Sequence, residues 1–419
     1  MYNWYKILTY LFYPFANFFL FIRKIKKKEH INRYKEKLSK IEKYRGDGFL
    51  IWFHAASVGE CMSILPLIQE MENNPKINKI LITSITLSSE KILHDKFSQS
   101  SKVIHQFLPL DIPIFVKHFL NHWSPDLAIF VDSEIWPNLI FKIKNEKIPL
   151  ILINGRITKK TFLKWKLISS FAKDIFKKFD LCIAASKESE NYLKILGAKN
   201  VKNYGNLKFS ETKLKDNSKL NPIFLNEIKN RKVWCAASTH FSEELFCGKV
   251  HLNLKKNYKE ILTIIIPRHV NRIDEIKKQL IDLELNVLLY SNINQINNKT
   301  DILLVDAYGK APGFFKLTKN VFLGGSLIKH GGQNPIEASR LGCKILHGPN
   351  ISNFIEIYDL LKSLRVSYEV NNENDLYQCL MTTFRDKNID NVEAINKINN
   401  YGISVFNNVM KEIKAYINI

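Results

Sequence analysis

Phe49-Leu50-Ile51-Trp52-Phe53-His54-Ala55-Ala56-Ser57-Val58-Gly59-Glu60 organises this chain. Its first five residues form an uninterrupted apolar run, which predicts a buried strand. Ser57 stands where a helix should begin, and Glu60 falls in the first turn of that helix. A buried strand that passes through small residues into a helix N-terminus is typical of open α/β sheets, which bind ligands beyond the carboxyl ends of their strands.

Glu60 has two interpretations on this pattern. Ser57-x-x-Glu60 matches a capping box, a common motif in which the serine caps the helix and the glutamate bonds back toward the serine N–H. Alternatively, Glu60 is a general base at the mouth of a cleft. Gly59 favours the second interpretation weakly, because glycine in a first helical turn costs stability and is better explained by close approach of a ligand.

Length and composition bound the class of protein. A chain of 419 residues with 46% hydrophobic and 24% charged residues should fold into two domains with ample core. The net charge of +22 predicts an anionic partner such as nucleic acid, anionic lipid or a phosphorylated substrate, although a general enrichment in lysine would give the same charge. The six cysteines show no C-x-x-C spacing, which predicts buried thiols rather than disulfides or a zinc site.

The N-terminal segment reads as a membrane anchor over residues 1–35. Residues 7–22 carry no charge and are dense in Phe, Tyr and Leu, and a lysine-rich run follows at 23–28. The uncharged run is shorter than the ~20 residues of a spanning helix. We therefore predict an interfacial or marginally spanning anchor whose basic flank lies on anionic lipid at the cytoplasmic side. The alternative is a hydrophobic helix packed on the body of the protein.

After this segment, apolar runs alternate with amphipathic stretches, which predicts parallel sheets covered by helices on both faces. We predict a Rossmann-like domain at 36–207, a linker at 208–222, a second Rossmann-like domain at 223–390, and a C-terminal helix at 391–419 that can cross back to the first domain. The predicted strands are 49–55, 79–85, 101–108, 126–133, 149–154, 181–186, 232–237, 261–266, 286–290, 301–305, 320–323 and 344–347.

Two glycine pairs mark the loop after the predicted strand at 320–323. Gly324-Gly325 follows this strand, and Gly331-Gly332 precedes Gln333-Asn334-Pro335-Ile336-Glu337, where a helix should begin. Glycines let backbone N–H groups approach a phosphate, and a helix N-terminus favours an anion. Asn334 suits the N-cap and Pro335 the first helical position, while Glu337 suits the ribose hydroxyls of a nucleotide. A capping arrangement with tight turns is the alternative.

Other polar residues stand at the ends of predicted strands. Arg268 follows Pro267 and suits a phosphate or a base edge, although a surface arginine is the usual alternative. His269 is more simply a satisfied histidine than a catalyst. The loops Ser238-Thr239-His240 and Asp306-Ala307-Tyr308-Gly309-Lys310 follow two more strands of the second half.

In the first half, Asp132 and Glu134 end a predicted strand, and paired acids suggest either a metal site or charge stabilisation. No further acid or histidine stands at ligand spacing, so the metal site is the weaker interpretation. Lys208, in Gly205-Asn206-Leu207-Lys208, stands beside the predicted linker, where a lysine can reach a cleft or simply be solvated.

Taken together, these segments resemble the family of 3-deoxy-D-manno-oct-2-ulosonic acid (Kdo) transferases. The matching segments stand in the family's order: His54-Ala55-Ala56-Ser57-Val58-Gly59-Glu60, Glu134-Ile135-Trp136-Pro137-Asn138, Gly205-Asn206-Leu207-Lys208, Ala237-Ser238-Thr239-His240, Pro267-Arg268-His269, Gly324-Gly325-Ser326 and Gly332-Gln333-Asn334-Pro335-Ile336-Glu337. Each match is weak alone, and the ordered set is specific.

The resemblance implies an α/β fold of the GT-B type, with two Rossmann-like doubly wound domains that face a cleft and an N-terminal membrane-associating segment. The first domain would bind a lipid A precursor, and the second would bind CMP-Kdo. Transfer of Kdo would invert the anomeric centre of the donor with no bound metal and no cofactor. This step of lipopolysaccharide biosynthesis would take place at the cytoplasmic face of the inner membrane.

The resemblance also implies roles for individual residues. The general base falls on Glu60, and the charge-stabilising residues fall on Glu134 and Lys208. The contacts to CMP fall on Pro267, Arg268, Tyr308, Gly309, Lys310, Asn334, Pro335, Ile336 and Glu337. Lys310 departs from the family, which usually has an acid at that position, so only the backbone contact is implied there.

Two other classes of function share some of these features. A nucleotide-sugar epimerase would have two such domains, but it would act on a soluble nucleotide sugar without a membrane segment. A membrane-bound nucleic-acid-binding protein would fit the charge, but it would need aromatic residues interleaved with the basic surface. The aromatic residues stand mainly in apolar core runs and in the N-terminal segment, so we expect no nucleic-acid partner.

Overall fold

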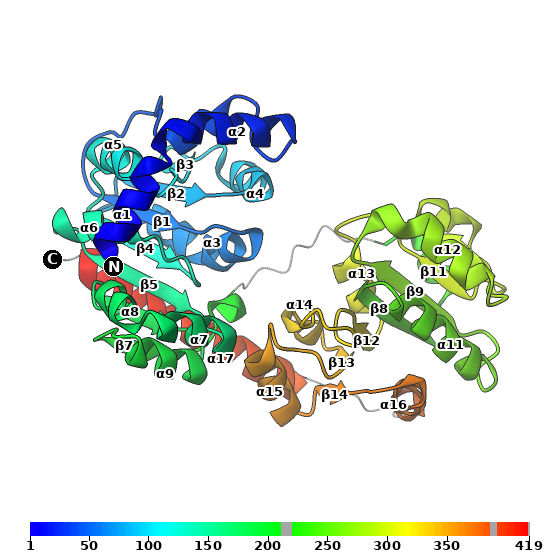
Figure 1. The fold of residues 1–419 in the computed structure, drawn as a ribbon. Helices are drawn as coiled ribbons and strands as arrows, with labels where there is room; N and C mark the ends of the chain where they lie inside the picture. Colours follow the sequence, from blue (N-terminus) through cyan, green and yellow to red (C-terminus); the bar gives the residue numbers. More distant parts are fainter. Residues whose placement is uncertain (211–219, 386–391, 418–419) are drawn as a thin grey trace. The chain divides into compact units, whose positions relative to one another are not determined.

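The computed structural model describes residues 1–210, 220–385 and 392–417 (Figure 1). Most of the predicted linker at 208–222, and the predicted boundary at 390, lie outside these described residues. The chain divides into two compact units, which we call unit 1 and unit 2. Unit 1 comprises Met1–Thr212 with Tyr401–Ile419, and unit 2 comprises Lys213–Asn400.

Unit 1 is built on a seven-stranded parallel sheet with the strand order β3-β2-β1-β4-β5-β6-β7. The strand order reverses between β1 and β4, which is where open α/β sheets bind ligands. All residues of β1 and β4 are buried, because helices cover both faces of a parallel sheet. The strands are β1 (Leu50–His54), β2 (Lys79–Ser84), β3 (Val103–Phe107), β4 (Leu127–Val131), β5 (Leu150–Gly155), β6 (Leu181–Ala184) and β7 (Val201–Asn203).

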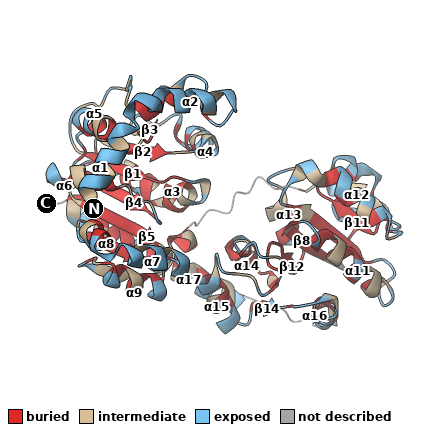
Figure 2. Ribbon diagram, in the orientation of Figure 1, coloured by how far each residue is buried: buried red, intermediate tan, exposed pale blue. Residues whose placement is uncertain are grey.

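Successive side chains of β1 point into two separate cores, one on each face of this sheet. Trp52 joins a core that also contains residues of the helices at 113–123 and 137–145, whereas Phe53 joins a core with the helix at 58–72. Figure 2 shows the buried residues concentrated in the strands and along one side of the covering helices. The helices after the N-terminal segment are α3 (Val58–Glu72), α4 (Leu87–Phe97), α5 (Pro113–Trp123), α6 (Pro137–Asn145), α7 (Lys159–Leu167), α8 (Ser169–Phe176) and α9 (Lys187–Ile195), with 3-10 turns η2 (Arg33–Leu38) and η3 (Leu207–Ser210).

Unit 2 also has a seven-stranded parallel sheet, with the order β10-β11-β9-β8-β12-β13-β14 and a reversal between β8 and β12. The strands are β8 (Val233–Thr239), β9 (Leu262–Pro267), β10 (Val287–Leu289), β11 (Ile302–Leu304), β12 (Asn320–Leu323), β13 (Lys344–His347) and β14 (Ser367–Glu369). The helices are α10 (Pro222–Glu227), α11 (Glu243–Lys255), α12 (Ile273–Ile281), α13 (Ala311–Leu317), α14 (Ile336–Arg340), α15 (Ile355–Ser363) and α16 (Glu373–Arg385), with 3-10 turns η4 (Val270–Arg272) and η5 (Tyr290–Gln295).

The last helix, α17 (Val392–Ile417), contributes to the core of unit 1. Its residues Val405, Val409 and Ile413 are buried in the same cluster as Ile51 and Phe53 of β1. Apolar residues spaced three to four apart lie on one face of a helix, which explains why this stripe is buried.

The N-terminal segment folds as two short helices, α1 (Tyr2–Leu11) and α2 (Ala16–Ile25), joined by the 3-10 turn η1 (Tyr13–Phe15), which contains Pro14. α1 is fastened to the body of unit 1. The Tyr2 ring stacks on Phe141 of α6, with centroids 3.7 Å apart, and the Tyr5 hydroxyl donates to Asp111 at 2.9 Å. This segment is therefore packed on unit 1 along one side.

The opposite side of α1 and α2 is exposed and apolar. By length and composition, Tyr2–Ile25 is able to cross a membrane, and only 11% of it is buried. Three exposed lysines, Lys26, Lys27 and Lys28, follow directly. We call the exposed residues Trp4, Ile7, Leu8, Tyr10, Leu11, Phe12, Phe15, Phe18, Phe19, Phe21, Ile22 and Ile25 the apolar face. An apolar face beside a basic run fits a membrane-associating segment.

The predicted fold class, with two parallel α/β sheets, is confirmed. All the strands predicted from the sequence are present, whereas β7 and β14 were not predicted. Both missed strands have three residues and lie at a sheet edge, where a strand needs no continuous apolar run. The amphipathic stretch at 160–178 predicts one continuous helix, and this prediction is wrong, because Ile168 has non-helical backbone angles (φ −117°, ψ 43°) that separate α7 from α8.

Candidate functional site

The residues that the sequence singles out form two groups, one in each unit. In unit 1 they gather around the reversal between β1 and β4. Glu60 lies in the first turn of α3 directly after β1, Asp132 and Glu134 follow β4, and Lys208 lies in η3 after β7. The group in unit 2 lies on the loops after β8, β9, β11 and β12.

Glu60 is a capping residue and a half-buried carboxyl at the same time. Its backbone N–H donates to Ser57 Oγ at 3.4 Å, and the Ser57 hydroxyl donates to Glu60 Oε1 at 2.8 Å. The backbone N–H of Ala56 donates to Glu60 Oε2 at 2.8 Å. A Cβ added at Gly59 would meet no atom within 4 Å, so the space beside this turn is open. The serine cap of the predicted capping box is therefore present, but the carboxylate accepts from the Ala56 N–H and the Ser57 hydroxyl in place of the Ser57 N–H. These bonds do not exclude a ligand.

The protonation of Glu60 is tuned by its surroundings. Its pKa is raised to about 7, chiefly by burial and further by the negative charges of Glu134 and Asp132, while hydrogen bonds from Ser57 and Ala56 act in the opposite direction. A carboxyl group with a pKa near neutrality can take up and release a proton under physiological conditions, which is the property required of a general base.

Glu134 is held in place by two aromatic side chains. The indole N–H of Trp136 donates to Glu134 Oε2 at 2.9 Å, and His54 Nε2 lies 3.3 Å from the same oxygen. His54 is fully buried at the end of β1, and its Nδ1 lies 3.0 Å from the hydroxyl oxygen of Thr83 on β2. The position of Glu134 therefore depends on residues from two neighbouring strands.

Positive charge accompanies these carboxylates. Asp132 has a left-handed backbone (φ 62°), and its carbonyl accepts from the backbone N–H of Arg156 at 3.2 Å. Burial raises the pKa of Asp132, and the charges of Lys208 and Arg156 oppose that rise. Burial lowers the pKa of Lys208, and the negative charge of Asp132 opposes that fall. The site thus combines three carboxyl groups with two cationic side chains.

Lys208 is placed by two asparagines. Asn154, the penultimate residue of β5, has a left-handed backbone (φ 52°), and its Oδ1 accepts from the backbone N–H of Leu207 at 2.8 Å. The Oδ1 of Asn206 accepts from the backbone N–H of Lys208 at 3.0 Å. These bonds fix the turn that carries the lysine. A left-handed asparagine at a strand end is the kind of strained backbone that clusters at functional sites.

Sequence reasoning missed Arg156 and Asn154 as members of this group, and it quoted His54 and Trp136 only as parts of motifs. A signal for the missed pair existed, because Asn154 and Arg156 stand at the end of a buried strand that neighbours β4. Sequence reasoning also did not predict that the segment after β4, which carries Glu134, contacts helix α1. Asn138, four residues after Glu134, donates to Thr9 Oγ1 of α1 at 2.9 Å.

In unit 2, the glycine loop after β12 is fastened by the buried carboxylate of Glu243. Its oxygens accept from the backbone N–H groups of His240, Gly325, Ser326 and Leu327, at 2.9, 2.7, 3.1 and 3.0 Å respectively. A Cβ at Gly324 would lie 2.5 Å from the carbonyl oxygen of Ser238. Only glycine allows the loops after β8 and β12 to approach this closely.

The predicted nucleotide contacts of unit 2 differ in exposure. Pro267 is buried at the end of β9, whereas the side chain of Arg268 is exposed. The Tyr308 side chain is 71% exposed, and Gly309 has a left-handed backbone (φ 76°). Lys310 lies with its ammonium nitrogen 5.7 Å from the centroid of the Tyr290 ring.

The segment Asn334–Glu337 begins helix α14 one residue later than expected. Asn334 Oδ1 accepts from the backbone N–H of Ile336 at 3.1 Å, and Pro335 precedes the first helical residue rather than occupying it. The side chains of Asn334 and Glu337 are exposed, whereas Pro335 and Ile336 are buried. The two polar side chains are therefore accessible to a ligand, and the two apolar ones anchor the turn.

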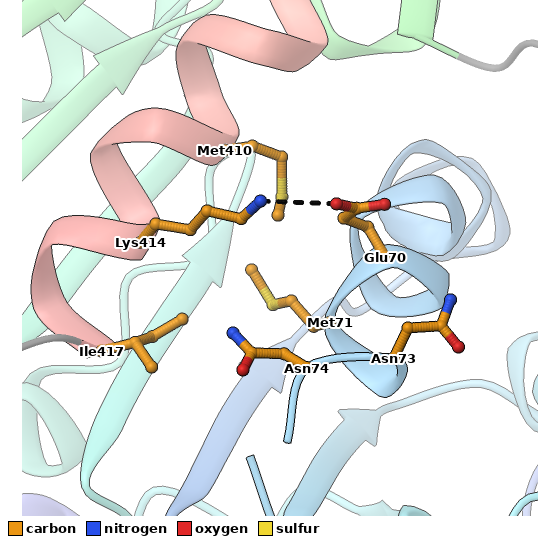
Figure 3. Close-up of a pocket in the computed structure, with 7 residues that line it drawn as sticks. All are labelled: Glu70, Met71, Asn73, Asn74, Met410, Lys414 and Ile417. Carbon is orange, nitrogen blue, oxygen red and sulfur yellow. Dashed lines mark hydrogen bonds and ion pairs between the residues drawn. The ribbon is translucent and has the colours of Figure 1, made fainter. Parts of the chain in front are cut away.

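Two hollows in unit 1 lie away from Glu60. Figure 3 shows one of about 190 Å³ between the C-terminal end of α3 and α17, crossed by the ion pair of Lys414 and Glu70 at 3.3 Å. A neighbouring hollow of about 490 Å³ lies along the same two helices. Glu60 lies at the opposite end of α3, so these hollows are not part of the charged group.

A third hollow, of about 310 Å³, lies in unit 2. It is lined by Lys329, His330, Gly331, Pro349, Asn350, Ile351, Ser352 and Ile355. Among the residues that the structure describes, no group of three or more His, Cys, Asp or Glu side chains is arranged to hold a metal ion.

Comparison with known proteins identifies relatives of the chain. Residues 28–211 match the family model described as 3-deoxy-D-manno-octulosonic-acid transferase (kdotransferase). A 3-deoxy-D-manno-octulosonic acid transferase of Rickettsia bellii is 36% identical over 377 residues, which are 90% of this chain and 89% of that protein.

Solved structures resemble the chain in fold. A glycosyltransferase from Rickettsia africae covers 88% of this chain and 98% of its own, with a TM-score of 0.56 at 14% identity. The UDP-GlcNAc 2-epimerase of Neisseria meningitidis covers 88% of this chain and 99% of its own, with a TM-score of 0.57 at 14% identity. Both similarities are in fold alone, so they do not distinguish a transferase from an epimerase.

Proposed function

This chain belongs to the family of 3-deoxy-D-manno-octulosonic acid (Kdo) transferases, and we propose that it transfers Kdo from CMP-Kdo to a lipid A precursor. The chain is thus a glycosyltransferase, and the proposal concerns its donor, its acceptor and its mechanism. The proposed reaction inverts the anomeric centre of the donor and needs no metal ion.

The observation that carries the mechanism is the half-buried Glu60, whose pKa is raised to about 7. A sugar hydroxyl is a poor nucleophile, so its proton must be removed as it attacks. In the proposed step, Glu60 takes the proton of the acceptor hydroxyl while the hydroxyl oxygen bonds to the anomeric carbon of Kdo. The bond from that carbon to the phosphate oxygen breaks, and CMP departs with the electron pair.

Glu134 and Lys208 are proposed to stabilise charge during this step. Partial positive charge develops on the anomeric carbon, which the carboxylate of Glu134 stabilises, and negative charge develops on the departing phosphate, which suits Lys208 and Arg156. The hydrogen bond from the Trp136 N–H and the contact with His54 Nε2 keep Glu134 in one position. Preorganised charges of this kind need no rearrangement when the reaction occurs.

Donor binding is proposed for the exposed polar groups of unit 2. Arg268 would bind the phosphate of CMP, and Asn334 and Glu337 would bind the nucleoside, with Glu337 accepting from ribose hydroxyls. Pro267, Pro335 and Ile336 would shape the surface beneath the nucleotide. Tyr308, Gly309 and Lys310 would contribute through the loop after β11, where the Lys310 side chain is already directed to Tyr290.

The apolar face of α1 and α2 is proposed to lie in the membrane interface, at the cytoplasmic face of the inner membrane. A lipid A precursor is anchored in a bilayer by acyl chains and carries phosphates. Aromatic residues and lysines side by side suit the boundary between acyl chains and anionic headgroups. The contact of Asn138 with Thr9 ties this helix pair to the segment that carries Glu134.

The proposed function is tested by incubating the purified protein with CMP-Kdo and lipid A precursor and weighing the products by mass spectrometry. We expect the acceptor to gain one or more Kdo residues, and the mass increment gives their number. A product formed from a soluble nucleotide sugar alone, with no lipid product, would indicate an epimerase-like enzyme and overturn the proposal.

A further inference from the structure

Three histidines from three separate loops gather in unit 2. The ring of His240, after β8, lies with its centroid 4.3 Å from the ring of His330, after β12, and 5.8 Å from the ring of His269, after β9. Gln333 Nε2 lies 3.2 Å from His240 Nε2. The loops belong to three strands that are adjacent in the sheet, and β8 and β12 flank the reversal of strand order. We call His240, His269, His330 and Gln333 the imidazole cluster.

Side chains of the imidazole cluster lie close to the backbone of Gly325. A Cβ at Gly325 would lie 3.0 Å from His330, 3.2 Å from His240 and 3.3 Å from Gln333. The backbone of Gly325 is itself held by the Glu243 carboxylate at 2.7 Å. The arrangement of the rings is therefore imposed by the loops beneath them, and it does not depend on chance contacts of mobile side chains.

The groups around the cluster favour a negatively charged ligand. Arg268 is exposed and adds positive charge, whereas Arg272 is paired with Glu244 at 3.1 Å and with Glu275 at 3.3 Å. Both oxygens of the nearby Glu243 are occupied by backbone N–H groups. Burial, followed by His330, His269, Arg268 and Arg272, lowers the pKa of His240 to about 4. Burial is the larger cause and disfavours any charge at this ring, whereas the positive charge of Arg268 favours an anion beside it.

Two of the three rings are available to a ligand. His269 and His330 are exposed, and within the described residues neither imidazole has a side-chain hydrogen bond. His330 also lines the hollow of about 310 Å³ in unit 2, beside Lys329. This volume lies at the lower end of the range of small-molecule sites, about 300 to 1,000 Å³.

We propose that the imidazole cluster binds the carboxylate of the sugar acid in the donor, and so distinguishes Kdo from neutral sugars. This inference rests on the proposed function. CMP-Kdo carries two anionic groups, a phosphodiester and a carboxylate, and Arg268 is already proposed for the phosphate. Imidazole and amide N–H groups at a switch point suit a carboxylate, because each can donate to one of its oxygens.

The test compares the donor with CMP, which shares the phosphate but lacks the carboxylate. In the transfer assay with lipid A precursor, His269→Ala and His330→Ala should each raise the KM for CMP-Kdo about tenfold to a hundredfold, the effect of losing a hydrogen bond to a charged group. The affinity for CMP, measured by calorimetry, should stay unchanged. His94→Ala, which removes an exposed histidine of α4 in unit 1, is the matched control and should alter neither constant.

A conservative variant separates binding from support of the fold. His330→Arg keeps N–H donors at an exposed position, so its KM for CMP-Kdo should stay within about threefold of the unaltered protein, less than the effect of losing one such bond. His330→Ala and His330→Arg should unfold at the same temperature. A purely structural role would make both variants weak or both normal.

Other results would contradict binding of the carboxylate by the imidazole cluster. Equal losses for CMP-Kdo and CMP would assign the cluster to the phosphate, and no loss in either alanine variant would remove it from the donor site. If the unaltered protein bound neither CMP nor CMP-Kdo, the proposed function would fail and the inference with it. Donor binding by the unaltered protein with normal KM values in the variants would overturn the inference alone.

Discussion

Both units carry a seven-stranded parallel sheet, yet the loops at the carboxyl edges of the two sheets differ in charge. In unit 1 the loops bring together the carboxyl groups of Glu60, Asp132 and Glu134 with the cations Lys208 and Arg156. In unit 2 the corresponding edge presents imidazoles, arginine and glycine turns. The sheet fixes where a ligand can bind, and the loops decide which chemistry is available there.

The carboxylates of the two units also differ in what they bond. Glu60 accepts from one backbone N–H and one hydroxyl, and its pKa lies near 7. Glu243 accepts from four backbone N–H groups and is 1% exposed. A carboxylate whose oxygens accept four backbone hydrogen bonds holds a loop in place. A carboxylate that accepts fewer hydrogen bonds, beside an open turn, can still take up and release a proton.

The largest expected effect comes from Glu60→Gln, which removes the base and keeps the shape of the side chain. Transfer should fall by about 10²- to 10⁴-fold, because general base catalysis typically contributes that much. CMP affinity, which we propose to reside in unit 2, should not change. Glu70→Gln, at the exposed end of the same helix, is the control and should retain full activity. Transfer by Glu60→Gln within about tenfold of the unaltered protein would refute the role of Glu60.

The second prediction concerns Glu337 in unit 2. Glu337→Ala should weaken CMP binding about tenfold or more by removing charge-assisted hydrogen bonds to the ribose. Calorimetry with CMP measures this loss directly. Asp282→Ala, an exposed acid at the end of α12, should bind CMP normally. Unchanged CMP affinity in Glu337→Ala would rule out its role in nucleotide binding.

A third prediction concerns the apolar face of unit 1. The double change Trp4→Ser with Phe18→Ser removes two side chains that are 72% and 64% exposed. Each aromatic ring transferred from water is worth about 1.5–3 kcal/mol, so binding to vesicles with anionic lipid should weaken at least tenfold. Sedimentation with vesicles measures the loss, and Ile223→Ser, in α10 of unit 2, should bind as before. Equal vesicle binding by the double variant would contradict the membrane role of this face.

A smaller effect is expected on stability as a function of pH. The folded-state pKa of Glu60, about 7, exceeds its ordinary value of 4.5, so the folded protein binds more protons between these values. Stability should therefore fall as the pH rises from 4.5 to 7, and this contribution should be absent in Glu60→Gln. Urea unfolding at pH 5 and pH 8 measures the difference. Parallel pH profiles for the two proteins would show that the pKa of Glu60 is not raised.

No effect is expected from chelation. If Lys208 and Arg156 stabilise the departing phosphate, EDTA should leave transfer unchanged, because the positive charge comes from side chains. The assay compares initial rates with and without chelator. Inhibition that divalent metal reverses would point instead to a metal site at Asp132 and Glu134.

Much of the fold follows from local sequence patterns. The apolar runs of β1, β4 and β5 are buried on both faces, and such runs are recognisable without tertiary information. The edge strands β7 and β14 are not recognisable in this way, because a strand of three residues without an apolar run carries too little pattern. The kink at Ile168 between α7 and α8 is likewise invisible, since no proline or glycine marks it.

The sequence predicted some residues of the candidate site in unit 1 and missed others. Glu60, Glu134 and Lys208 stand beside strand ends and in motifs, so their positions were visible in the sequence. Arg156 stands in no such motif, and it joins the group only because β5 lies beside β4 in the sheet. The roles proposed for these residues remain predictions that the variants above address.

Local sequence patterns alone predicted two parallel α/β units, an apolar N-terminal segment with a lysine-rich flank, and an ordered set of motifs, because strand burial and helix capping depend on a few neighbouring residues. Only the tertiary structure decided that Glu60 combines a capping bond with a pKa near 7, that Glu243 fastens the glycine loop, and that three distant histidines meet. Desolvation and charge pairing depend on residues far apart in the chain, and no local pattern records them.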